Sequence, residues 1–289
     1  MPRQDNGSLD RLNRAVDLDR YPIHEPDSAA FGRLVAYCRE ELADDGCCVV
    51  ADFLRPESVA RMVAEADALA PRANRSEQHH NPYFTADDPG LPPDHPRRAF
   101  QKRTNGFVCY DLIDAASDLR AIFNAEPMTA FVTRAFAKPR LYRYADPLAA
   151  MPINTMGPGD AFPWHFDTNE FTVTIVIQTA ERGGTFEYAP DLRTAEDERY
   201  DDVAAVLAGD DTRVRRLALH AGDIQLFEGR YTLHRVTRVE GRRPRHVAIP
   251  SWAAKPGMVG KPHRTKDIYG RLTEAHRAQG YERVDALLD

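Results

Sequence analysis

The sequence predicts an α+β protein in which helices flank a central β region. Helical spacing of apolar residues marks residues 30–46 and 55–70, and a helical pattern returns at the end of the chain, from about 265 to 289. Between them, from about residue 140 to 253, short runs of Val, Ile, Thr and aromatic residues alternate with Gly and Pro, as in strands and turns. We therefore expect a β core with helices at both ends.

The length and composition fit one catalytic domain. A chain of 289 residues, 43% of them apolar, can bury a full hydrophobic core. The first thirty residues are polar and weakly periodic. We expect residues 1–30 to form an irregular arm and residues 31–289 to form a single domain.

The charge and hydropathy argue against several classes of partner. A formal net charge of −6 gives no general attraction to nucleic acid or to anionic membranes. The arginines between positions 235 and 245 are interpreted as a solvated turn and not as a nucleic-acid patch. The amino terminus lacks the apolar stretch of a signal peptide, and no aliphatic run is long enough to span a bilayer. We expect a cytoplasmic protein that binds neither nucleic acid nor membranes.

The amino-terminal part of the domain is predicted to be scaffold. Its first helix ends at Gly46, a short apolar strand follows over residues 47–54, and Pro56 stands in the first turn of the next helix. Residues 111–138 are predicted to be helical again. No CxxC spacing occurs, so we expect the four cysteines to be reduced, buried and structural: Cys38, Cys47, Cys48 and Cys109.

Residues 72–106 are crowded with Pro, His, Asp and Arg and have neither a helical nor a strand period. An irregular segment of this length inside a compact domain is typically either a functional lid or disordered, and we favour the lid. We predict that it covers a pocket. Its histidines show no spacing typical of a metal site, and we expect His79, His80 and His95 to be surface loop residues.

The segment "WHFDTNEFTVTIVIQ" places two metal-ligand side chains at the mouth of a predicted strand. Residues two apart in a strand point to the same face, so His165 and Asp167 lie side by side while Phe166 turns away. A third ligand, His234, stands in a second strand-like run. Two histidines and one carboxylate are the ligand set of non-haem Fe(II) oxygenases, which leaves three metal positions free.

An arginine follows the third predicted ligand. If "VEGRRP" is a hairpin turn, Arg245 returns on the neighbouring strand and faces the same cavity as His234. A guanidinium there offers a bidentate fork to a carboxylate, which implies a carboxylate-bearing co-substrate. Arg243 has the same strand parity and is the alternative anchor.

This arrangement of an HxD motif, a distal His and a following Arg resembles the Fe(II)/2-oxoglutarate-dependent dioxygenase superfamily. The resemblance covers residues 140–253 by motif and includes "GGTFEYAP" between the two ligand segments. It implies a double-stranded β-helix, or jelly-roll, core and the oxidative decarboxylation of 2-oxoglutarate. Fe(II), 2-oxoglutarate and O2 are therefore the implied cofactors, with Arg245 holding the far carboxylate of 2-oxoglutarate.

More closely, "YRYADPL", "WHFDTNEFTVTIVIQ", "GGTFEYAP" and "HRVT" look like the branch of halogenases and hydroxylases of free amino acids. That branch implies a small, polar, amino-acid-like substrate. Its halogenases replace the metal-binding carboxylate with Gly or Ala, so that halide can occupy the vacated position. This chain keeps Asp167, and we predict an oxygenase of the hydroxylase type.

Several polar residues near the motif are candidates for further contacts. Asn154, on the preceding strand, is a candidate for 2-oxoglutarate or substrate, or an exposed strand residue. Thr172, Thr174 and Gln178 share one strand face that lines the cavity or faces solvent. The candidates for substrate are Asn169 and Arg103, the latter for a carboxylate, and Asp146 and Glu170 for an amine.

Other functions are compatible with parts of this pattern. The same cofactors support desaturation or ring closure, because geometry decides the fate of the substrate radical. A zinc hydrolase also uses two His and a carboxylate, often as HExxH on a helix, which is absent here. A non-enzymatic jelly-roll binding protein would not need the metal ligands or the arginine. An oxygenase of protein or nucleic-acid side chains would need an open groove, whereas the lid favours a closed pocket.

Overall fold

The computed structural model, which describes residues 6–75, 77–278 and 287–288, confirms the α+β class. The described strands form a nine-stranded and a four-stranded sheet. The larger sheet runs β1 (Cys47–Val50), β13 (Ile224–Phe227), β9 (Phe171–Gln178), β16 (Arg245–Ala248), β7 (Ile153–Met156), β5 (Gly106–Val108) and β2 (Asn74–Arg75), with β17 (Ser251–Ala253) and β6 (Tyr142–Arg143) attached through β9. The smaller sheet runs β12 (Arg215–Leu217), β11 (Phe186–Ala189), β14 (Leu233–Val236) and β8 (Phe162–His165).

The two sheets pack face to face as a jelly roll, and all the pairs within them are antiparallel. Aromatic side chains from both sheets meet between them, for example Phe186 and Phe227 with ring centroids 5.2 Å apart. Two short ribbons extend this core: β3 (Gln78–His80) with β4 (Gln101–Arg103), and β10 (Arg182–Gly183) with β15 (Val239–Glu240).

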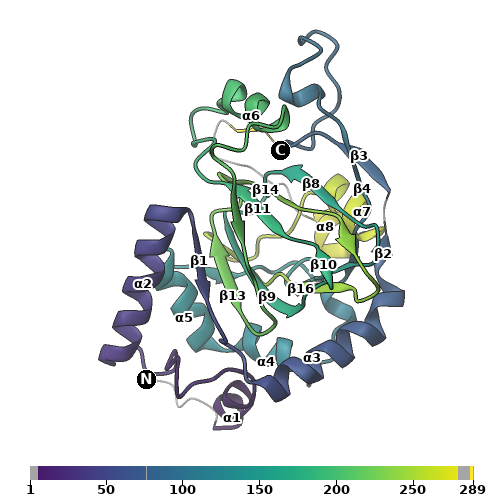
Figure 1. Ribbon diagram of the computed structural model, residues 1–289. Coiled ribbons are helices and arrows are strands. Elements are labelled where there is room, and N and C mark those ends of the chain that lie inside the picture. The colour runs from purple at the N-terminus through teal and green to yellow at the C-terminus, as the bar shows by residue number, and fades with distance from the viewer. Residues whose placement is uncertain (1–5, 76, 279–286, 289) are drawn as a thin grey trace.

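A layer of helices covers the outer face of the larger sheet (Figure 1). It comprises α1 (Asn6–Ala15), α2 (Ala29–Asp45), α3 (Pro56–Leu69), α4 (Asp118–Asn124) and α5 (Glu126–Ala135). Strand β9 shows how the sheet separates two environments. Phe171, Val173, Ile175 and Ile177 pack against the helices, so the alternate residues of this strand face the interior between the sheets. Polar residues on the inner face are thereby available for a site.

The predicted helices of the scaffold are confirmed. Ser28 caps α2 by accepting a hydrogen bond from the Phe31 N–H, and Gly46 ends the helix with φ of 69°. Pro56 occupies the first turn of α3. The four cysteines are free and buried, as expected.

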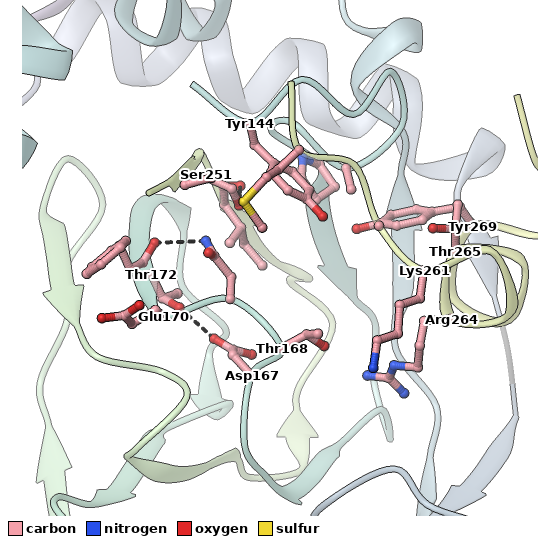
Figure 2. Close-up of a pocket in the computed structure, with 18 of the residues that line it drawn as sticks. Tyr144, Asp167, Thr168, Glu170, Thr172, Ser251, Lys261, Arg264, Thr265 and Tyr269 are labelled. Carbon is pink, nitrogen blue, oxygen red and sulfur yellow. Dashed lines mark hydrogen bonds between the residues drawn. The ribbon is translucent and has the colours of Figure 1, made fainter. Parts of the chain in front are cut away.

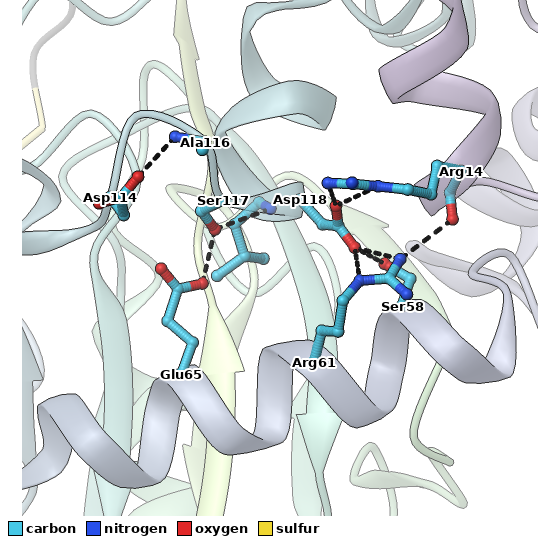
Figure 3. Close-up of polar contacts among 9 residues, drawn as sticks. Arg14, Ser58, Arg61, Glu65, Asp114, Ala116, Ser117 and Asp118 are labelled. Carbon is cyan, nitrogen blue, oxygen red and sulfur yellow. Dashed lines mark hydrogen bonds and ion pairs between the residues drawn. The ribbon is translucent and has the colours of Figure 1, made fainter.

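The prediction of an irregular amino-terminal arm is wrong for the described part of residues 1–30. Helix α1 packs into the main core, where Leu12, Ala15 and Val16 are fully buried. A buried carboxylate fixes it, because Asp118 of α4 accepts hydrogen bonds from Arg14 at 2.7 Å and from Ser58 and Arg61 of α3 at 2.8 Å (Figure 3). Although burial opposes it, these bonds lower the pKa of Asp118.

Replacing Asp118 with alanine is expected to lower the free energy of unfolding by about 1–3 kcal/mol, because a buried Ser58 hydroxyl and two arginines lose their acceptor. Urea unfolding of the whole chain measures the change. Asp19, whose exposed carboxylate pairs with Arg55 at 2.9 Å, provides the matched control. Asp19→Ala should cost less than about 1 kcal/mol. Equal effects of the two substitutions would contradict the anchoring role of Asp118.

Three further boundaries differ from the prediction. Residues 72–106 are not wholly irregular, because β2 and β5 extend the larger sheet and β3 pairs with β4. Two short 3-10 helices, η1 (Ala70–Arg72) and η2 (Pro96–Arg98), flank or interrupt this segment, and a third, η3 (Tyr110–Leu112), follows it. The region 140–253 also contains a helix, α6 (Tyr200–Leu207). The tail forms α7 (Pro262–Tyr269) and α8 (Glu274–Ala278), and residues 279–286 and 289 of the predicted tail helix lie outside the described residues.

Candidate metal centre and adjoining pocket

The two histidines of the predicted metal site face each other across neighbouring strands. His165 ends β8 and His234 lies directly opposite it in β14, with ring centroids 4.1 Å apart. The Nδ1 atom of His165 lies 2.8 Å from the Pro163 carbonyl oxygen, and that of His234 lies 2.9 Å from the Thr232 carbonyl oxygen. Each Nδ1–H donated to a carbonyl leaves Nε2 as the atom that can bind a metal.

Asp167 completes the group from the turn after β8. Its Oδ1 atom lies 3.7 Å from Nε2 of His165 and 3.5 Å from Nε2 of His234. One potential ligand atom from each of the three side chains lies within 4.8 Å of the other two. The structure therefore brings together the three residues that the sequence singles out.

The ionisation of this group suits a divalent metal. Burial, and next the neighbouring His234, hold the pKa of His165 well below its ordinary value. Burial opposes ionisation of Asp167, but the two histidines outweigh it and lower the pKa of this carboxyl. A neutral imidazole and an ionised carboxylate are the forms that coordinate metals. The donor set of two imidazoles and one carboxylate fits Fe(II).

Arg245 lies on the inner face of β16, opposite Met156 of β7. Its side chain is 7% exposed, and burial lowers its pKa to about 10. No carboxylate in the described part of the chain forms an ion pair with it. Arg243, the alternative anchor, is exposed and donates to the carbonyl oxygens of Thr179 and Ala180. The hairpin register thus places the Arg245 side chain in the interior and the Arg243 side chain at the surface.

Two buried asparagines lie on or beside the two strands that follow β16 in the larger sheet, Asn154 on β7 and Asn105 directly before β5. Asn154 pairs with Val247 and Phe107, and it is 3% exposed, so it is not the exposed strand residue of the alternative prediction. Asn105 stands two residues before Phe107 and is 1% exposed. The amide oxygen and nitrogen of both side chains have no hydrogen-bond partner among the described residues.

Unsatisfied buried amides cost free energy, so their presence indicates a ligand that satisfies them. With the guanidinium of Arg245, they fit a small molecule that carries a carboxylate and further oxygen acceptors, as 2-oxoglutarate does. The sequence prediction missed Asn105. Its only signal is its place two residues before an apolar strand residue, in "RTNGFV", within the segment interpreted as a lid.

A pocket of about 300 Å³ is lined by His165 and Asp167 of the candidate metal group. Figure 2 shows this pocket, with Asp167 labelled. Asn169 and Glu170 line it, as the sequence predicts. The Asn169 amide donates to a backbone carbonyl oxygen at 3.0 Å, and the Glu170 carboxylate accepts from Lys138 at 3.3 Å. An aromatic part of the wall is formed by Phe84, Phe107 and Phe162.

Two predicted substrate contacts do not lie in this wall. Asp146 is fully buried, and its carboxylate accepts from the N–H groups of Leu148, Ala149 and Gly260 and pairs with His276 at 2.8 Å. The prediction that Asp146 faces a substrate amine is therefore wrong, because a structural network uses both oxygens. Arg103 is 1% exposed, stacks on Phe162 at 5.7 Å and donates to Gln78. It is not a lining residue of the pocket.

Only one of the three polar residues predicted on the inner face of β9 lines the pocket. Thr172 lines it and donates a hydrogen bond to Asp167. The Thr174 hydroxyl donates to the Gln225 amide oxygen, and the Gln178 amide donates to the Pro244 carbonyl oxygen.

One histidine of the predicted lid is buried. His80 is 7% exposed, and its ring centroid lies 4.3 Å from that of Phe84, so the prediction that His80 is a surface residue is wrong. Packing of the loop against the pocket, which the sequence does not specify, buries His80.

The pocket also contains residues that the sequence prediction missed. They lie directly after β6, in or after β17, and in or directly before α7: Tyr144, Ser251, Lys255, Lys261, Arg264 and Tyr269. The heads of Lys261 and Arg264 point across the pocket toward Thr168 and Asp167 (Figure 2). The Arg264 guanidinium lies 3.6 Å from the centroid of Phe84. No motif marks these residues, because the chain brings them to the pocket only through the fold.

The family model of "Halogenase D" matches residues 32–268. The chain belongs to the Halogenase D family. The matched residues include most of α2, all of α3 to α5, both sheets and most of α7, so the match extends well beyond the motifs at residues 140–253. No curated protein matches the sequence significantly.

Solved structures similar to this Halogenase D family member show the same fold at low identity. A prolyl hydroxylase from Trichoplax adhaerens, solved with a peptide fragment of hypoxia inducible factor, has a TM-score of 0.52 and 11% identity, over 77% of this chain and 90% of that one. AviO1 from Streptomyces viridochromogenes Tue57 has a TM-score of 0.52 and 17% identity, over 78% of this chain and 97% of that one. A Pseudomonas putida prolyl-4-hydroxylase has a TM-score of 0.50 and 13% identity, over 77% of this chain and 99% of that one.

The similar solved structures confirm the predicted jelly roll. Membership of the Halogenase D family, together with the group of His165, Asp167 and His234, agrees with the predicted enzyme class, a 2-oxoglutarate-dependent oxygenase. The predicted cofactors Fe(II), 2-oxoglutarate and O2 belong to this class and agree with the group of His165, Asp167 and His234. A non-enzymatic binding protein is therefore not retained. Among the residues that the structure describes, none of the helices combines the length and hydropathy needed to cross a bilayer.

Proposed function

We propose that this protein is an Fe(II)/2-oxoglutarate-dependent hydroxylase of a small, amino-acid-like metabolite. The observation that carries the proposal is the carboxylate of Asp167, whose Oδ1 atom lies 3.7 and 3.5 Å from the Nε2 atoms of His165 and His234. A halogenase of the free-amino-acid branch that the sequence resembles would have Gly or Ala at this position. Here the carboxylate occupies the place that a halide would need, which favours oxygen transfer.

The chain provides separate places for the metal and the co-substrate. His165, Asp167 and His234 would hold Fe(II), and Arg245 with Asn154 and Asn105 would hold 2-oxoglutarate. When bound, Fe(II) with 2-oxoglutarate and O2 supplies an oxidant strong enough to break an unactivated C–H bond. The protein binds the substrate so that one carbon lies nearest the metal, and it keeps water away.

The pocket supports a substrate with both charged and apolar parts. Glu170 is an acidic residue of its wall and Lys255 a basic one, while Phe84 and Phe107 offer apolar surface. A free amino acid or a close derivative presents an amine, a carboxylate and a carbon chain to such a wall. In this proposal Asn169 and Glu170 contact the substrate. A volume of about 300 Å³ is of the size of small-molecule sites.

Hydroxylation of an amino acid is tested by succinate formation. The holoenzyme, reconstituted with Fe(II), 2-oxoglutarate and ascorbate, is incubated with single free amino acids and derivatives, and succinate and products are measured by mass spectrometry. We expect at least one amino acid to stimulate succinate formation and to gain one oxygen. A product that loses two hydrogens would instead support desaturation or ring closure. Stimulation only by a peptide, a nucleotide or an apolar metabolite would contradict the proposed substrate class.

A further inference from the structure

Two residues outside the candidate ligand group hold Asp167 in place, one at its carboxylate and one at its backbone. The Thr172 hydroxyl, on the inner face of β9, donates to Oδ2 of Asp167 at 2.7 Å. The Asp167 backbone N–H donates to the carbonyl oxygen of Gly229 at 2.9 Å, in the turn between β13 and β14. Both contacts leave Oδ1 of Asp167 facing His165 and His234.

Gly229 lies so close to this hydrogen bond that a side chain there has no room. A Cβ atom at position 229 would collide with Oδ2 of Asp167 and with the hydroxyl of Thr172, and it would lie 2.9 Å from Cβ of Asp167. The backbone does not explain the glycine, because Gly229 is not among the glycines with positive φ. Space for the carboxylate explains it.

We propose that Thr172 and Gly229 are positioning residues that make Asp167 present one oxygen to the metal. The Thr172 hydroxyl donates a hydrogen bond to Oδ2 of Asp167, and the missing side chain at Gly229 leaves room for the carboxylate beside the turn. A carboxylate that turned both oxygens to the metal would fill one of the positions that 2-oxoglutarate and O2 need. The inference rests on the proposed metal site, but not on the identity of the substrate.

Separate substitutions test the role of Thr172 and the role of Gly229. Thr172→Val keeps the shape of the side chain but removes the donor, whereas Thr172→Ser keeps the donor. Gly229→Ala adds one methyl group against the carboxylate. Gly32→Ala, in α2, is the matched control, because a Cβ atom there meets nothing within 4 Å.

Anaerobic titration of the full-length apoprotein with Co(II), followed by visible absorption, tests the proposal without turnover. We expect Thr172→Val and Gly229→Ala to weaken Co(II) binding about 10–100-fold and to change the shape of the Co(II) spectrum. Thr172→Ser should restore both, and Gly32→Ala should match the parent. Thermal unfolding of each apoprotein separates loss of positioning from loss of the fold.

Parental Co(II) affinity and spectrum in Thr172→Val would overturn the role of Thr172, and the same result in Gly229→Ala would overturn that of Gly229. If Gly229→Ala does not fold, the comparison of Thr172→Val with Thr172→Ser decides the proposal. The outcome is distinguishable from failure of the proposed function. A parent protein that binds Co(II) but oxidises no amino acid would contradict the substrate and leave the positioning supported, whereas a parent that binds no Co(II) would contradict the metal site itself.

Discussion

Alanine at any of His165, Asp167 or His234 is expected to abolish turnover and to weaken Fe(II) binding by at least about 100-fold, since even residues that only orient a ligand cost 10–100-fold when changed. Each side chain offers one of three potential ligand atoms that lie within 4.8 Å of one another. Two remaining ligands cannot impose the same geometry. Turnover at limiting iron and anaerobic metal titration measure the two effects.

His79 supplies the matched control for the two histidines, because it is an exposed imidazole on β3, outside the metal group. His79→Ala should retain parental turnover and metal affinity. Parental turnover at limiting iron in the variant of His165, Asp167 or His234 would remove that residue from the ligand set. Circular dichroism of the variants should remain unchanged, because the sheets pack through apolar residues outside this group.

Arg245→Ala is expected to raise the 2-oxoglutarate requirement steeply while metal binding stays nearly intact. Loss of one partner from a buried, hydrogen-bonded charge pair costs roughly 2–5 kcal/mol, so we expect an increase of at least about 30-fold in the KM for 2-oxoglutarate. The side chain is 7% exposed, and burial lowers its pKa to about 10, so a carboxylate from the co-substrate would meet a desolvated cation.

Arg243→Ala is the matched control for this substitution. Arg243 belongs to the same hairpin, but its side chain is exposed and its guanidinium donates to the backbone carbonyl oxygens of Thr179 and Ala180. Its removal should change the 2-oxoglutarate requirement by less than about fivefold, because exposed interactions contribute little. A large effect of Arg243→Ala with a small effect of Arg245→Ala would reverse the assignment of the anchor.

The spacing of His165 and Asp167 marked this group in the sequence, on the expectation that both side chains lie on one face of a strand. In the structure only His165 belongs to β8, and Asp167 reaches the same place from the turn that follows. The preference for Arg245 depended on a hairpin register, and strand parity alone left Arg243 open. In the structure Arg245 is buried and pairs with Met156 on β7, whereas Arg243 is exposed, which favours Arg245.

Other parts of the site could not be predicted because long-range packing creates them. Asp146 looked like a free acid in "YRYADPL", but tertiary contacts with Gly260 and His276 use its carboxylate. Lys261 and Arg264 reach the pocket from a helix almost a hundred residues after His165. The amino-terminal helix was missed for a related reason. Helix α1 is short and mostly polar, so its sequence does not mark it as part of the core. Leu12 is buried only because α3 and α4 pack against this helix.

The most direct test of hydroxylation by this Halogenase D family member is a single turnover experiment with isotopically labelled O2 in chloride buffer. The enzyme carries Fe(II), 2-oxoglutarate and the amino acid that best stimulates succinate formation, and mass spectrometry reads the label and any chlorine in the product. If Asp167 fills the position that a halide would take, as we propose, we predict one labelled oxygen atom in succinate, one in the hydroxylated amino acid and no chlorine. A chlorinated product, or a product without the label, would contradict the proposed function.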